Sequence, residues 1–130
     1  MLMGNVAKDY RVSVMCTRTK EFTVAKRLLG MHTLVLDSCV FIWIGERSRL
    51  DALGFAHMAK GAILLEGPSR LPIDTLTCRI SRLFPQKQVF FSTDLSTDDI
   101  EFWADVLKSI VEEVASNAHF YGVSTNANAQ

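Results

Sequence analysis

Two short apolar runs near the middle of the chain constrain its fold more than any other feature. Residues 34–36 and 40–44 are apolar throughout, Asp37-Ser38-Cys39 separates them, and Gly45 closes the second run. Neither run is long enough for a helix, and polar residues between two such runs are typical of a β-hairpin. The sequence therefore predicts a hairpin of two well-buried strands.

The length of 130 residues is that of one domain. A hydrophobic content of 48% with 22% charged residues indicates a globular chain. We expect a flexible N-terminus over residues 1–8, one domain over 9–115 and a disordered polar tail over 116–130. Residues 11–17 alternate in polarity, with Val12, Val14 and Cys16 on one face, as in a half-buried strand.

Two later segments have the apolar spacing of helices. Between Pro72 and Pro85 the apolar residues recur at helical intervals, which predicts a helix over about 72–84. Residues 89–92 indicate another buried strand, and a second amphipathic helix is expected over 97–115. Strands followed by helix, strand and helix predict an α+β domain, with a mainly antiparallel sheet or sandwich flanked by these two helices.

Residues 49–60 fit two structures. Leu53, Ala56 and Ala59 share one side of a possible helix, whereas Leu53, Phe55 and His57 alternate as in a strand. Gly54 weakens the helical alternative, because glycine lowers helix stability by about 1 kcal/mol. The pattern alone leaves both open.

The cysteines and the longest apolar run bear on the compartment. Cys16, Cys39 and Cys78 are odd in number and form no Cys-x-x-Cys pair, so neither a disulfide framework nor a zinc site is expected. The apolar run 40–44 is far shorter than the about 20 residues of a membrane helix, and no secretory signal is visible. We expect a reducing compartment, the cytoplasm or the nucleus, and no membrane partner.

The formal net charge is zero, but the charges are unevenly placed. Residues 1–93 carry 13 basic and 7 acidic side chains, whereas residues 94–130 carry one basic and 7 acidic ones. Such runs are either solvated faces or complementary docking surfaces. The candidates for charged contacts are Arg79 and Arg82 on the first helix and Asp105 and Glu112 on the second. Zero net charge without exposed aromatic residues among the basic ones argues against a nucleic-acid partner.

No pattern of catalytic or metal-ligating residues stands out. His32, His57 and His119 are far apart in the sequence and have no metal-type spacing. No nucleophile elbow or phosphate loop is present. The sequence predicts no enzyme, no cofactor and no metal site.

Three segments in order resemble the proteasome assembly chaperone 4 family. They are the hairpin and aromatic strand over 36–45 (LDSCVFIWIG), the basic helical stretch 79–83 (RISRL), and residues 87–95 (KQVFFSTDL) followed by an acidic amphipathic helix. The resemblance covers about residues 11–114. It implies a strand over 49–58. The chain departs from the family in a short stretch between Glu66 and Asp74, in Thr93-Asp94, where the family has an aromatic–amide pair, and in a longer polar tail.

The resemblance implies a non-enzymatic chaperone. Members pair with a related assembly chaperone (number 3) and bind the α-subunit ring of the proteasome core during its assembly. Self-pairing of the isolated protein is a further expectation. For partner contacts we expect Val12, Val14, Arg79, Arg82, Asp105 and Glu112. For the core we expect Phe41, Trp43, Val89, Phe90 and Trp103.

A gelsolin-like module that binds actin and calcium is the alternative. The strand over 40–45 and Glu101-Phe102-Trp103 faintly resemble it. That module has a helix directly after the Trp-Gly strand, so the structure of residues 49–58 discriminates between the two families.

Overall fold

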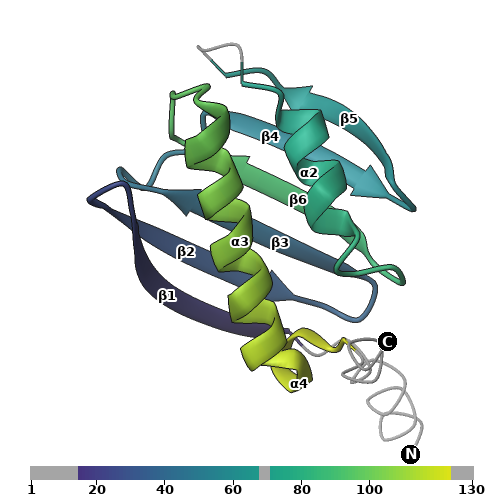
Figure 1. Cartoon of the computed structure of the whole chain (residues 1–130). Coiled ribbons are helices and arrows are strands. Elements are labelled where there is room, and N and C mark those ends of the chain that lie inside the picture. The colour runs from purple at the N-terminus through teal and green to yellow at the C-terminus, as the bar shows by residue number, and fades with distance from the viewer. Residues whose placement is uncertain (1–14, 68–70, 124–130) are drawn as a thin grey trace, which may run out of the picture.

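The computed structural model describes residues 15–67 and 71–123, which form a sheet with helices packed on one face (Figure 1). The strands are β1 (Cys16–Val24), β2 (Arg27–Val35), β3 (Cys39–Gly45), β4 (Ala52–His57), β5 (Lys60–Leu65) and β6 (Gln88–Thr93). The helices are α2 (Ile73–Ser81), α3 (Ile100–Ser116) and α4 (Ala118–Tyr121).

All six strands belong to one mixed sheet with the order β1-β2-β3-β6-β4-β5. Neighbouring strands are antiparallel except β3 and β6, which run parallel. The parallel pair arises because the chain makes the β4–β5 hairpin after β3, and α2 then returns it to the middle of the sheet. The predicted α+β class is confirmed, whereas the sandwich is not found in the described residues.

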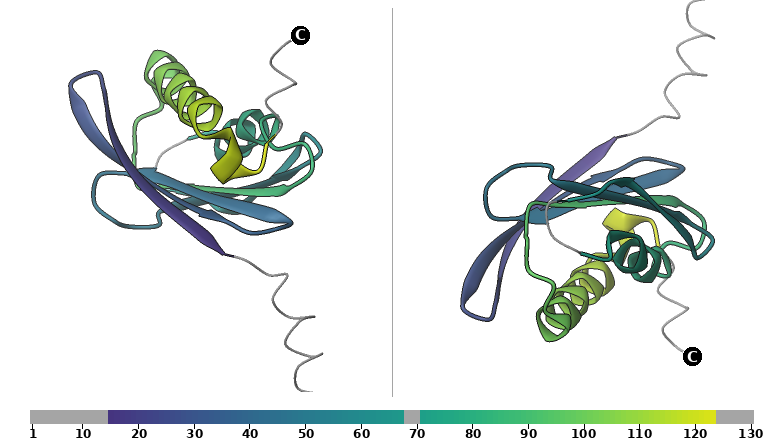
Figure 2. Two further views of the ribbon diagram at one scale, coloured as in Figure 1. Left: turned by 90° about the horizontal axis from the view of Figure 1, so that it is seen from below. Right: turned by 90° about the horizontal axis from the view of Figure 1, so that it is seen from above.

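The helices lie on one face of the sheet instead of flanking it, as both views in Figure 2 show. The predicted helix over 72–84 is confirmed as α2, which ends earlier, at Ser81, and continues in tight turns to Phe84. The predicted helix over 97–115 is confirmed as α3, which begins after Asp99 because that carboxylate caps it by accepting a hydrogen bond from the Glu101 amide.

The predicted strands are confirmed where the structure describes them. Val35 pairs with Val40 across the expected β2–β3 hairpin, and residues 52–57 form β4, as the chaperone resemblance implied. Of the strand expected over 11–17, residues 11–14 lie outside the described residues, and Cys16 and Thr17 begin β1. The sequence did not predict the part of β1 beyond residue 17, the part of β2 before residue 34, or β5.

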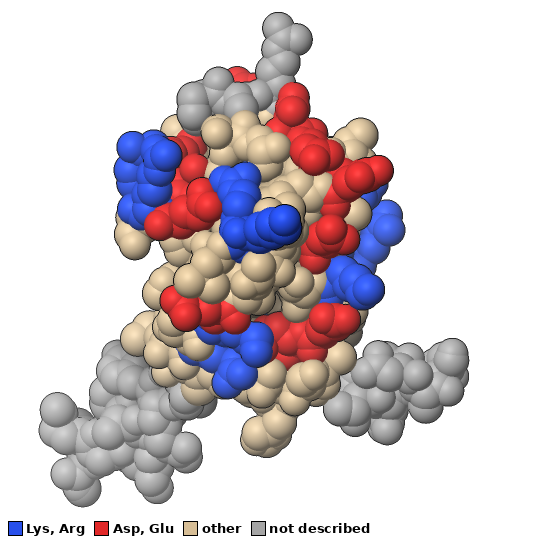
Figure 3. Space-filling view, turned by 60° about the vertical axis from the view of Figure 1, so that its left-hand side comes forward, with Lys and Arg blue, Asp and Glu red and all other residues tan. Residues whose placement is uncertain are grey.

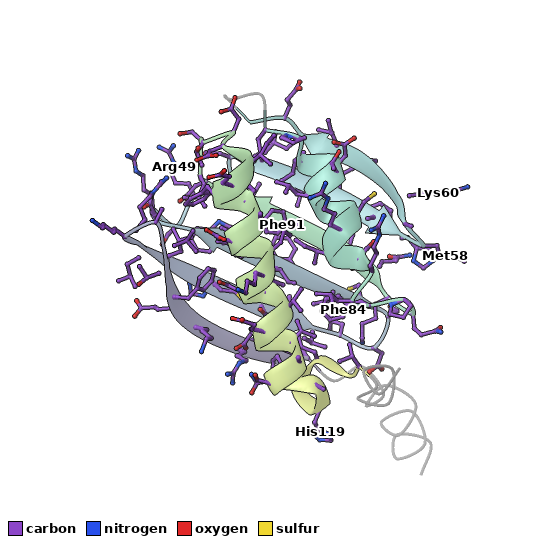
Figure 4. All side chains as sticks on the ribbon, in the orientation of Figure 1. Arg49, Met58, Lys60, Phe84, Phe91 and His119 are labelled. Carbon is purple, nitrogen blue, oxygen red and sulfur yellow. The ribbon has the colours of Figure 1, made fainter. Side chains whose placement is uncertain are left out.

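The core lies between the helix-covered face of the sheet and α2 and α3. Phe91 at its centre packs edge-on against Trp103, with ring centroids 6.2 Å apart (Figure 4). Val89 and Trp103 are buried, as predicted. Phe41, Trp43 and Phe90 are half-buried on the opposite face, so their expected place in the core is wrong. They alternate with buried neighbours because successive side chains of a strand point to opposite faces.

Several predictions concern the two ends of the chain. The expected flexible N-terminus and the interface residues Val12 and Val14 lie outside the described residues. The expectation of disorder from residue 116 on is corrected for 116–123, because α4 folds back and fully buries Tyr121 against the core. The sequence hid this helix because its flanking residues are small and polar.

The β4–β5 turn places Met58 and Ala59 in the left-handed backbone region, with φ of 53° and 66°. This two-residue turn is one that glycine and asparagine favour. Replacing Ala59 with glycine should therefore raise the free energy of unfolding by about 0.5–1 kcal/mol, because the β-carbon is strained there. Urea denaturation measures the gain. Ala62→Gly, within extended β5, is the control and should destabilise; equal effects of the two changes would contradict the strain argument.

Candidate functional site

In the part of the chain that the structure describes, one face of the sheet carries apolar side chains but no helix (Figure 2). We call it the open face. Its members point away from α2 and α3, since each alternates along its strand with a residue of the helix-covered core. They are Leu28, His32 and Leu34 of β2, Phe41 and Trp43 of β3, Leu53 and Phe55 of β4, and Phe90 of β6.

Three phenylalanines form a row across the middle of the open face. Phe90 is in register with Phe41 on one side and with Phe55 on the other. Its ring centroid lies 6.4 Å from that of Phe41 and 5.0 Å from that of Phe55. Leu34 and Ala62 continue the row on the outer strands. The row is a continuous apolar band over five neighbouring strands.

A second row lies two residues further along the strands and contains Trp43. The ring centroids of His32 and Trp43 lie 5.3 Å apart. Trp43 Nε1 donates a hydrogen bond of 2.7 Å to the Arg49 carbonyl oxygen. With Ser48 and Leu50 these residues line a hollow of about 320 Å³. The Trp43 ring is therefore held in one orientation at this end of the open face.

The loop that holds Trp43 is itself fixed by one carboxylate. Asp94 is largely buried and accepts hydrogen bonds from the backbone amides of Glu46, Arg47 and Arg49, at 2.8, 2.7 and 3.2 Å. A β-carbon on Gly45 would lie 2.2 Å from Asp94 Oδ1, so this position requires glycine. The role of Asp94 is therefore to order the loop.

The open face is more apolar than a face exposed to water should be. Antiparallel strands with one wet face alternate apolar and polar residues, whereas strands buried on both faces are apolar throughout. Residues 40–44 are apolar without interruption. In the described residues the helices cover one face of this strand, and the other has no such layer. A contiguous uncovered apolar patch of this kind is typical of a protein–protein interface.

The four charged candidates within the described residues are exposed but separate. Arg79 and Arg82 lie at the end of α2, and Asp105 and Glu112 lie on α3. Among the described residues no ion pair joins the two sets. Acidic and basic side chains alternate over the side of the molecule shown in Figure 3. Neither sign of charge occupies that side alone.

Arg82 also lines a second hollow. This hollow, of about 430 Å³, lies between the end of α2 and the C-terminal part of α3, where Phe84, Val111 and Val114 give it apolar walls. Lys87 lies at the same place, but its Nζ donates to the carbonyls of Leu36 and Asp37 at 2.6 and 3.0 Å. Lys87 therefore closes the β2–β3 turn.

Glu113 is a buried acidic residue of α3. It belongs to the acidic run of residues 94–130, yet it is 5% exposed. It accepts hydrogen bonds from Arg18 of β1, from the Tyr121 hydroxyl at 2.9 Å and from Asn117 Nδ2 at 3.2 Å. The hydrogen bond to Glu113 raises the pKa of Arg18, and burial raises the pKa of Tyr121 to about 12. This cluster ties β1, α3 and α4 together.

No protein-family model matches the chain, and no curated protein matches it. Within residues 15–67 and 71–123, no three potential metal-ligating side chains come together. In the same ranges, no helix has the length and apolar character needed to cross a membrane.

Proposed function

We propose that this protein is a non-enzymatic assembly chaperone of the proteasome core particle. It pairs through its open face with a related assembly chaperone, similar to chaperone 3, and the pair binds the α-subunit ring. The observation that carries this proposal is the band of Leu34, Phe41, Phe90 and Phe55, which has no covering layer within the described residues.

The open face suits a lasting partner. Fully buried interface cores are apolar and rich in aromatic residues, and polar residues surround them. Here Phe90 is central, with Phe41 and Phe55 beside it, and exposed His32 and Gln88 lie toward the margins. A standard interface buries about 800 Å² per partner, an area that a six-stranded face can supply. A related chaperone with a similar sheet would cover the open face of this protein and its own apolar face in one contact.

The segment after the Trp43 strand supports the chaperone over the gelsolin-like alternative. Residues 46–51 form a loop and Ala52–His57 form β4, which pairs with β5 and β6. The alternative requires a helix directly after this strand. The charged residues Arg79, Arg82, Asp105 and Glu112 remain exposed for contacts with α subunits.

Affinity purification from cells that express the protein tests the proposal. We expect it to recover proteasome α subunits and one chaperone of similar size. Phe55→Glu, which places a charge in the aromatic band, should lower the recovery of that chaperone by about 30-fold, as loss of an interface hot spot does.

The matched control is Ile100→Glu, because Ile100 is 82% exposed at the start of α3 on the opposite side of the sheet. This variant should recover both partners as the unmodified chain does. Thermal melting establishes that both variants fold. Recovery of actin without proteasome subunits, or equal recovery by Phe55→Glu and the unmodified chain, would overturn the proposal.

A further inference from the structure

The hollow between the ends of α2 and α3 has apolar walls that reach the surface. Both helices run in the same direction and end at the same end of the molecule (Figure 1). The volume of the hollow, about 430 Å³, is within the range of small-molecule sites, about 300–1,000 Å³. Val111, on its wall, is 45% exposed, although a valine side chain is more stable out of water. The apolar lining residues are Leu83, Phe84, Pro85, Val111, Val114, Ala115 and Val123.

The charged side chains that line this hollow are both basic. They are Arg82 and Lys87, and among the described residues neither forms an ion pair. Lys87 is half-buried, and its ammonium group donates to two uncharged carbonyl oxygens. Because an ammonium group has three donors, one donor of Lys87 remains. Two positive charges therefore lie at an apolar hollow without a negative partner in the described residues.

The carbonyl groups at the two helix ends already have donors. Helix C-termini attract cations because their last carbonyl groups lack partners within the helix. At the end of α3, Asn117 donates its side-chain amide to the Glu113 carbonyl at 3.0 Å and its backbone amide to the Val114 carbonyl at 3.2 Å. At the end of α2, the amides of residues 82–84 donate to the carbonyls of residues 79–81. The two basic side chains are therefore available to an anion.

We infer that this hollow binds a small organic acid, with its apolar chain against the walls and its carboxylate beside Arg82 and Lys87. Hydrogen bonds between these cations and a carboxylate are charge-assisted and are among the strongest in proteins. The apolar chain covers the exposed part of Val111. Residues 124–130 follow Val123, but they contain no apolar side chain larger than that of alanine, so they do not supply this group. The hollow lies on the helix-covered side, so the inference does not depend on the proposed function.

Titration of the isotope-labelled full chain with octanoate, followed by NMR, tests this site. We expect saturable shifts of the backbone amides of Lys87, Ala115 and Gly122, with a Kd on the order of 1 mM. Hexanoate should bind about tenfold more weakly, because it buries two fewer methylene groups. Octylammonium has a chain of the same length and the opposite charge, and it should bind more weakly than octanoate by about tenfold or more.

Two pairs of variants place the ligand in the hollow. Arg82→Gln should weaken octanoate binding about fivefold, because it removes one of the two charges. Arg79→Gln is its control, since Arg79 is exposed one turn earlier on α2 and does not line the hollow. Ala115→Leu fills the hollow from α3 and should abolish the saturable shifts. Ala104→Leu, an exposed change on the same helix away from the hollow, should leave them unchanged.

Three results would overturn the inference: equal binding of octanoate and octylammonium, an unchanged Kd in Arg82→Gln, or shifts confined to the strands of the open face. N-acetyl-leucyl-leucine, which carries its carboxylate on a peptide, separates the two sources of such a group. Binding of this peptide at or below the affinity of octanoate supports the small acid. Binding tighter than that of octanoate by about tenfold or more would assign the hollow to a peptide C-terminus and also overturn the inference.

Discussion

Replacing Gly54 with alanine should lower the free energy of unfolding by about 2–3 kcal/mol and the melting temperature by roughly 10 °C. A β-carbon at this position would lie 2.2 Å from Thr77 Oγ1 and 2.9 Å from the Ile73 carbonyl oxygen. Thr77 Oγ1 donates a hydrogen bond of 2.6 Å to that same carbonyl and is fully buried. The added methyl group therefore displaces α2 from β4 instead of rotating one side chain.

Gly30→Ala is the matched control for this change. Gly30 lies in β2 of the same sheet, and its nearest neighbours would be 3.8–3.9 Å from an added β-carbon, which is ordinary contact. Its effect should stay within about 1 kcal/mol. Thermal melting and urea denaturation of both variants give the comparison. A Gly54→Ala protein that melts within about 2 °C of the unmodified chain would contradict the close approach of α2 to β4.

Gly54 also illustrates what the sequence pattern contained and what it did not. The alternation of Leu53, Phe55 and His57 allowed a strand beside a helix, and Gly54 weakened the helical alternative; the structure has a strand here. The pattern did not show which face the helices cover. In β4 the small residues Ala52, Gly54 and Ala56 face α2, and the large ones face outward. Large apolar residues usually mark the core side of a strand. In β4 the small residues are on the core side, because α2 approaches the strand closely, and the sequence pattern does not show this.

The missed features depend on contacts between distant parts of the chain. β5 had no turn signal, because its hairpin uses Met58 and Ala59 at positions where glycine or asparagine is usual. The exposed charges of β1 hid its pairing with β2. Glu113 looked like a solvated acid because its partner Arg18 is 95 residues away. Local periodicity therefore located α2, α3, β3 and β6, whereas the buried cluster and the open face depended on the tertiary arrangement.

The stability of this protein should fall as the pH rises from about 10 to 12, because of Tyr121. Burial raises the pKa of Tyr121 to about 12 in the folded state, whereas its ordinary value is 10. The folded state thus holds the phenol proton more tightly than the unfolded state. The stabilisation is complete below pH 10 and is lost as the pH approaches 12. A shift of this size corresponds to about 2–3 kcal/mol.

Tyr121→Phe isolates this effect, because every other ionisable group is the same in the two proteins. The variant keeps the ring that packs against Phe84, with centroids 6.1 Å apart, but removes the hydroxyl that donates to Glu113. It should be about 1 kcal/mol less stable than the unmodified chain at pH 8, because Glu113 loses one donor. Urea denaturation at pH 8, 10 and 11.5 should show the unmodified chain losing this advantage as the pH rises, until the variant is the more stable. Parallel stability curves for the two proteins would show that the Tyr121 hydroxyl titrates as it does in water.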